Sequence, residues 1–313
     1  MTQGEISWIP GALSLTSGSF LLLGGRLADL YGRKKMLSLS MLGFTIWTLI
    51  ASFSTEKYMP GWELSNGRYL FFVSRGMQGV FASGGTPAAL GILGAAYPPG
   101  KRKNRVFATF SAGNPTGWVV GLLIGGFLTS YASWCWGFRV ITIITAVITG
   151  LSFIYVPPDA PRDPLRRKEK VDWLGAILII CGITGICYAL SDAGNTPNGW
   201  RTWYIIFSLL LGCVFVGLFL WWESRVQYPL MPLSIWKVPQ FLRLMVVIAL
   251  GFSCFTGFLG FTWSLWFQQI DQASPITVDP FDSIADLDHI IFPSPILFRR
   301  GCECSCCNDY ASS

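Results

Sequence analysis

Eight apolar runs constrain what this chain can fold into. Each run is close to the ~20 helical residues that cross the hydrocarbon core of a bilayer. The runs cover residues 8–25, 36–53, 70–96, 106–130, 138–156, 173–191, 203–222 and 244–267. Because lipid cannot hydrogen-bond an open strand edge, a helix is the expected form of each run. The sequence therefore predicts an all-α integral membrane protein with about eight transmembrane helices.

The composition agrees with a membrane protein and excludes other classes. Charged residues are 13% of the 313 residues, whereas soluble domains carry about 25%. The net charge of +6 lies mainly in loops between the apolar runs, so we interpret it as membrane topology and not as nucleic-acid binding. No run carries paired carboxylates or a Ser/His/Asp set, which argues against an enzyme. We expect no cofactor.

The basic residues are divided unequally between the two sets of loops. One set holds sixteen Lys and Arg residues and the alternate set holds four. Because basic loops remain in the cytoplasm, the first set is predicted to be cytoplasmic. An even number of spans would then place both ends of the chain on the outer side.

The densest group of cations, here called the basic segment, lies between the first two runs. It covers residues 25–35 and reads G-R-L-A-D-L-Y-G-R-K-K. Glycine permits a tight reversal, so a very short cytoplasmic loop is expected. Asp29 and Arg33 are four residues apart and can pair if a helical turn persists. An ordinary basic turn is the alternative, because the positive-inside rule alone favours such sequences.

The third run contains a charged residue, Arg75, deep inside it. An arginine in a bilayer costs at least ~2.5–3.5 kcal/mol, so it is expected to face a polar cavity and to have a partner. Gln78 and Thr86 share its helix face, which is the candidate proton or substrate pathway. The alternative is that Arg75 lies near the outer end of the run and reaches the interface.

The fourth run carries a ridge of glycines at every fourth position. The ridge comprises Gly113, Gly117, Gly121 and Gly125, and Gly126 follows it. Such spacing lets the backbone of a neighbouring helix come close. Pro115 lies in the same run and can kink the helix.

These three motifs, in this order, resemble those of the major facilitator superfamily. The basic segment is similar to the family loop G-x-L-a-D-r-x-G-R-k/r, and the third run is similar to the fourth-helix motif R-x-x-Q-G. The fourth run is similar to the antiporter motif G-x-x-x-G-P-x-x-G-G, with Leu122 in place of the proline. The positions that match the loop motif include Gly25, Asp29, Gly32, Arg33 and Lys34.

The resemblance implies a fold and a function. The two runs within residues 173–222 look like the extra helices of the fourteen-helix drug:proton antiporter branch. That branch implies proton-coupled efflux of small organic compounds by alternating access, in a fungal-type plasma or vacuolar membrane. The implied partners are a small-molecule substrate, protons and the lipid bilayer. The implied roles are a cytoplasmic gate for Asp29 and Arg33 and proton coupling for Arg75.

The resemblance also divides the chain. Aligned on its motifs, the chain starts at the second helix of the family, so an inactive or regulatory fragment from a mis-spliced gene model is the alternative function. The close cysteines Cys302, Cys304, Cys306 and Cys307 suit a soft metal, but their spacing is a weak signal and we expect no metal site. The expected parts are an N-terminal bundle (1–157), a basic loop with two linker helices (158–222), the first helix of a second half (223–268) and a polar tail (269–313).

Overall fold

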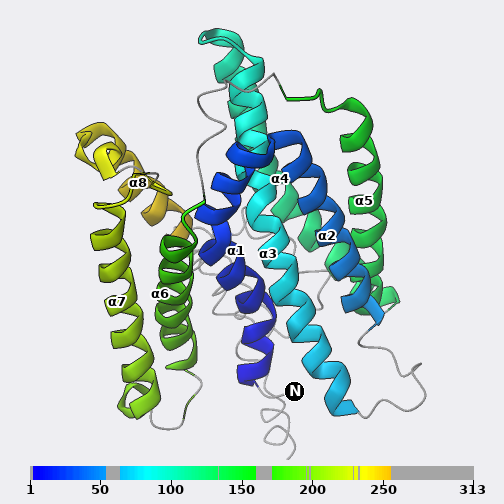
Figure 1. Cartoon of the computed structure of the whole chain (residues 1–313). Helices are drawn as coiled ribbons and strands as arrows, with labels where there is room; N and C mark the ends of the chain where they lie inside the picture. Colours follow the sequence, from blue (N-terminus) through cyan, green and yellow to red (C-terminus); the bar gives the residue numbers. More distant parts are fainter. Residues whose placement is uncertain are drawn as a thin grey trace, which may run out of the picture.

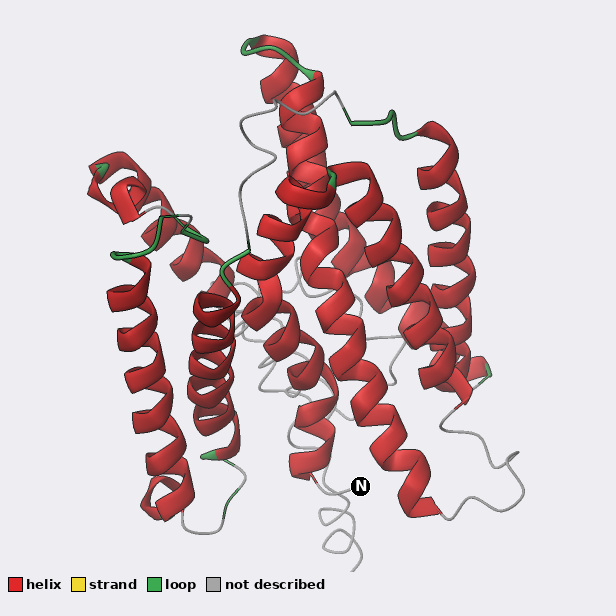
Figure 2. Ribbon diagram, in the orientation of Figure 1, coloured by secondary structure: helices red, strands yellow, loops and turns green. Residues whose placement is uncertain are grey.

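The structure is a computed structural model in which every described regular element is a helix (Figures 1 and 2). It describes residues 3–53, 64–132, 134–159, 171–194, 196, 199–227, 229–231 and 233–254. The α-helices are α1 (Gln3–Tyr31), α2 (Arg33–Phe53), α3 (Leu64–Ala96), α4 (Lys101–Tyr131), α5 (Trp134–Tyr155), α6 (Trp173–Asp192), α7 (Trp203–Glu223) and α8 (Pro239–Phe252). Two short 3-10 helices, η2 (Gly199–Arg201) and η3 (Leu233–Lys237), precede α7 and α8. The predicted all-α fold is confirmed.

Each of the eight predicted runs corresponds to one of these helices. Five of them, α2, α3, α5, α6 and α7, are long and apolar enough to cross a membrane. α1 and α4 have 29 and 31 residues, which exceeds the ~20 that a span requires. α8 has 14 residues, and residues 255–267 of the eighth run lie outside the described residues. The polar tail and its four cysteines also lie outside them.

The N-terminal helices form a bundle around α3. Both α1 and α2 pack along α3, and α5 packs on the other side of α2. Small residues permit this closeness, as membrane helices commonly require. A Cβ atom added to Gly24 of α1 would lie 2.8 Å from the carbonyl oxygen of Ser83 in α3. The side chains of Phe71 and Gln78 on α3 are buried within this bundle.

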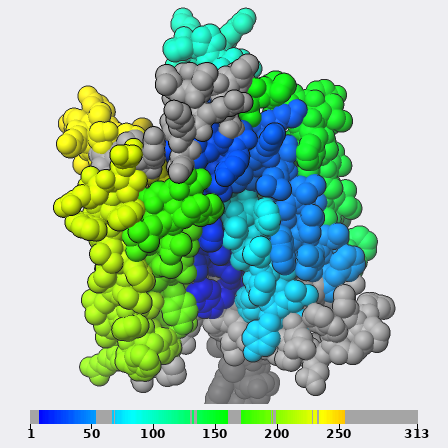
Figure 3. Space-filling model, viewed as in Figure 1, coloured from blue at the N-terminus to red at the C-terminus, as the bar shows by residue number. Residues whose placement is uncertain are grey.

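α6 and α7 run antiparallel beside the bundle and are here called the α6–α7 hairpin (Figure 1). α6 packs on α1, and α7 packs on α6 (Figure 3). A polar contact joins the two parts, since the hydroxyl groups of Ser19 on α1 and Thr184 on α6 are 3.1 Å apart. The outer face of α7 carries large exposed apolar side chains, including Trp203, Phe207 and Leu210. This face is suited to lipid.

Candidate functional site

The basic segment is mostly helical and not the short loop that the sequence predicted. α1 continues to Tyr31 and α2 begins at Arg33, so Gly32 alone separates the two helices. Gly32 has φ 110°, a left-handed conformation that glycine adopts at little cost. Its N–H donates to the carbonyl of Ala28 at 3.1 Å, and its own carbonyl accepts from Met36 N at 3.0 Å. Each helix therefore extends up to Gly32, and this is why the loop prediction was too long.

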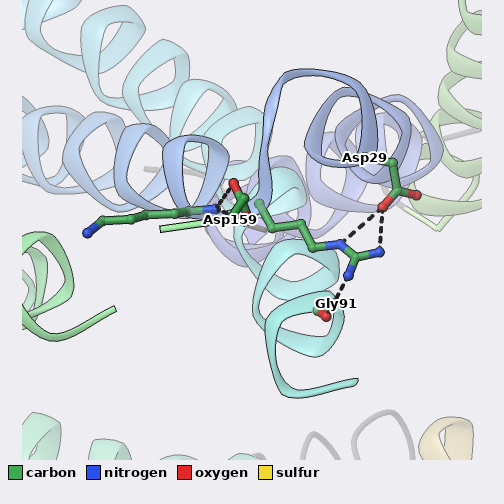
Figure 4. A network of polar contacts seen from close by, with 5 residues as sticks. Asp29, Gly91 and Asp159 are labelled. Atoms are coloured by element: carbon green, nitrogen blue, oxygen red, sulfur yellow. Dashed lines mark hydrogen bonds and ion pairs between the residues drawn. The ribbon is translucent and has the colours of Figure 1, made fainter. Parts of the chain in front are cut away.

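Arg33 is the centre of a polar network at this reversal (Figure 4). Its Nε and Nη2 atoms donate to Asp29 Oδ1 at 3.2 and 3.1 Å. Its Nη1 atom donates to the carbonyl oxygen of Gly91, on α3, at 2.8 Å. The fork of donors in a guanidinium group allows one side chain to hold both acceptors. Arg33 thus joins the ends of α1, α2 and α3.

Gly91 is a part of this network that the sequence did not indicate. A Cβ atom at position 91 would lie 2.6 Å from Arg33 Nε and 2.8 Å from Arg33 Cδ. The absence of a side chain there leaves room for the guanidinium group against the backbone of α3. The glycine stands between Leu90 and Ile92 in the apolar part of the third run, and its role follows only from the crossing of α2 and α3.

Asp159 is a second residue that the sequence did not indicate. Its Oδ2 and Oδ1 atoms accept from the backbone N–H of Lys34 at 3.2 and 3.4 Å. Lys34 is in the first turn of α2, where unpaired N–H groups and the helix dipole favour a carboxylate. Figure 4 shows Asp159 and Asp29 at the same junction. The available sequence signal was an acidic residue directly after Pro157 and Pro158, at the end of a span.

Arg75 and Gln78 form the second polar network, within α3. Arg75 Nη1 donates to Gln78 Oε1 at 3.0 Å, and Arg75 Nε donates to the carbonyl of Ile9 on α1 at 3.1 Å. Gln78 Nε2 donates in turn to the carbonyl of Trp47 on α2 at 3.2 Å. The guanidinium carbon is also 5.5 Å from the ring centre of Phe138 on α5. Four helices therefore contribute to this network.

Arg75, Gln78 and Thr86, which the sequence places on one face of α3, differ in how far they are buried. Gln78 is fully buried and Arg75 is half-buried, about three turns into α3. Thr86 lies about two turns beyond Gln78 and its side chain is exposed. Arg75 and Gln78 are thus brought together as predicted, whereas Thr86 is not in contact with either of them.

The glycine ridge of α4 faces open space among the described residues. Cβ atoms added to Gly113, Gly117, Gly121 or Gly125 would meet no described atom within 4 Å. Neighbouring side chains on α4 are exposed as well, among them Trp118 and Leu122. α4 packs only lightly on α3 and α5. The use of the ridge for helix packing stays a prediction.

Comparison with known proteins places these motifs in one family. The family model described as Major Facilitator Superfamily matches residues 1–278. The chain is 34% identical over 279 residues to the efflux pump terJ of Aspergillus terreus, covering 88% of this chain and 51% of that protein. It is 28% identical over 286 residues to a low affinity ammonium transporter of Saccharomyces cerevisiae, covering 90% and 53%.

A third relative is an uncharacterized MFS-type transporter of Schizosaccharomyces pombe. It is 30% identical over 275 residues, which is 88% of this chain and 50% of that protein. The chain therefore spans about half the length of these relatives. Since the family model covers most of the chain, and the helical fold agrees with it, the chain belongs to the Major Facilitator Superfamily.

Proposed function

We propose that this protein takes part in proton-coupled efflux of small organic compounds by alternating access. The observation that carries the proposal is the network of Arg75 and Gln78. A charged side chain inside a membrane helix is costly and is retained mainly for function. Here Arg75 donates to the backbone of α1, and Gln78, which accepts from Arg75, donates to the backbone of α2. A change in the packing of these helices therefore changes the surroundings of the charge.

The relatives support export as the direction. Their names include an efflux pump of Aspergillus terreus and a multidrug transporter of Aspergillus fumigatus that is 31% identical over 71% of this chain. Proteins with such names agree with the drug:proton antiporter branch that the motifs resemble. We further propose a plasma or vacuolar membrane as the location, Asp29 and Arg33 as a cytoplasmic gate, and the glycine ridge of α4 as a surface for a moving helix.

Transport in vesicles tests the proposal. The chain would be reconstituted into liposomes, a pH gradient imposed, and the movement of ethidium followed by fluorescence. We expect gradient-driven ethidium movement that Arg75→Gln reduces at least about tenfold, which corresponds to about 1.4 kcal/mol. Arg201→Gln is the control, since Arg201 is exposed in η2. An Arg75→Gln variant as active as the wild type would contradict the role of this charge.

A further inference from the structure

Glu223 is a buried carboxyl group that the proposed transport mechanism does not use. It is the last residue of α7 and is only 4% exposed. It lies at the same end of the molecule as the basic segment, which is the predicted cytoplasmic end. A buried ionisable group is costly unless it is paired or neutral, so its partners decide its state.

The two carboxyl oxygens of Glu223 differ in their hydrogen bonding. Oε1 accepts a hydrogen bond from the backbone N–H of Met231 at 2.5 Å. Oε2 is buried and has no hydrogen-bond partner among the described residues. An ionised carboxylate has about four acceptor positions, and here one oxygen would carry charge without a hydrogen bond of good geometry from the described part of the chain. A proton on Oε2 removes this charge.

Asp172, at the start of α6, is an acidic neighbour of Glu223. Asp172 caps the start of α6, where its Oδ1 accepts from Gly175 N at 3.0 Å. Its Oδ2 accepts from the indole Nε1–H of Trp222, also at 3.0 Å. Both oxygens of Asp172 therefore accept hydrogen bonds. Its negative charge acts electrostatically on Glu223.

The opposing influence comes from the basic segment itself. Arg26, near the end of α1, acts electrostatically on Glu223 with the opposite sign to Asp172. Arg26 is half-buried, so its field is less screened than that of a surface cation. Among the described residues, the charged groups that act on Glu223 are thus Asp172 from the start of α6 and Arg26 from α1, while the segment after α7 contributes the backbones of Leu230 and Met231.

We propose that Glu223 is a proton-binding group, and that its proton controls the contact between the α6–α7 hairpin and the basic segment. With the proton on Oε2 the buried carboxyl group is neutral. On release the O–H bond breaks, its electron pair stays on Oε2, and the proton passes to water at the predicted cytoplasmic end. The resulting carboxylate attracts Arg26, which lies three residues before Asp29 of the Arg33 network. The inference goes beyond the proposed function, because it does not require transport.

Infrared difference spectroscopy of the reconstituted chain tests the proton. We expect a carbonyl stretching band of a protonated carboxyl group at neutral pH, which disappears at alkaline pH. Glu223→Gln should abolish this band. Asp192→Asn is the matched control, because Asp192 ends α6 at the opposite end and accepts from the hydroxyl groups of Tyr188 and Tyr204. Absence of the band in the wild type, or its survival in Glu223→Gln, would overturn the proposal.

Amide hydrogen exchange tests the contact between the α6–α7 hairpin and the basic segment. It uses the wild type and an Arg26 variant, so it does not depend on correct folding of a Glu223 variant. In the wild type, raising the pH should increase the protection of residues 25–35 after correction for the intrinsic exchange rate. Arg26→Gln should retain the infrared band and lose this change. A change of the same size in Arg26→Gln and in the wild type would show that Arg26 is not the partner and would overturn the proposed control of the basic segment.

Discussion

Arg33 and Gly91 are in direct contact across α2 and α3, with Nη1 of the arginine 2.8 Å from the carbonyl oxygen of the glycine. The sequence indicated a local pair between Asp29 and Arg33, and the structure contains that pair at 3.1 Å. The contact with Gly91 adds a third helix. It makes the basic segment dependent on the position of α3, the helix that also carries Arg75.

Gly91→Ala should separate Arg33 from α3. The added methyl group would lie 2.6 Å from Arg33 Nε, so the guanidinium group must move and lose its bond. Because the arginine side chain is flexible and partly exposed, we expect a loss of about 1 kcal/mol in the free energy of unfolding, measured by thermal unfolding in detergent. Gly94→Ala on the same helix is the control, since its methyl group would meet only Phe107 Cζ at 3.9 Å. Equal effects of the two variants would refute the role of Gly91.

Arg33→Lys should weaken the same junction while keeping the charge. A lysine ammonium group is a compact charge on a flexible stem and lacks the planar fork that holds Asp29 and Gly91 together. Because the arginine side chain is 34% exposed, we expect a modest loss of about 1 kcal/mol in unfolding free energy. Lys35→Arg, at an exposed neighbouring position, should stay within about 0.5 kcal/mol of the wild type. If Arg33→Lys also stayed within this range, the planar guanidinium group would not contribute to the stability of the junction.

The bond between Arg75 and Gln78 should appear as coupling in a double-mutant cycle. Arg75→Leu, Gln78→Leu and the double variant would be compared by chemical unfolding in mixed micelles. Since the two side chains bond at 3.0 Å and Gln78 is fully buried, we expect a coupling energy above about 0.5 kcal/mol. Gln78→Leu combined with Arg201→Leu is the control pair and should be additive. Additivity of the first pair would mean that Arg75 does not depend on Gln78.

Two glycines inside helices, Gly79 and Gly121, should respond in opposite ways to substitution by alanine. A methyl group at Gly79 of α3 would collide with Thr16 Oγ1 of α1, whereas one at Gly121 of α4 would meet no described atom. We therefore expect Gly79→Ala to lower the midpoint of thermal unfolding. Gly121→Ala should leave it unchanged or raise it, because alanine is the better helix former by about 1 kcal/mol. A destabilised Gly121→Ala variant would show that the ridge is already packed.

The sequence predicted the parts of this structure that depend on local patterns. Apolar length located each helix. Helical spacing paired Arg75 with Gln78 within α3, and the separation of four residues paired Asp29 with Arg33 across the reversal at Gly32. Gly91 and Asp159 were missed because their roles depend on contacts between residues 58 and 125 positions apart in the chain. The reversal at Gly32 was predicted as a loop, since charged residues next to glycines are typical of loops and of helix ends alike.

The helix reversal at Gly32 has a mechanical consequence. A connection of one residue has only two soft backbone torsions, and both neighbours of Gly32 belong to helices. The connection between α1 and α2 is therefore too short to let the helices move independently. A tilt of one helix must either move the other or change the φ and ψ angles of Gly32. The backbone torsions of Gly32 thus set the angle between these two helices.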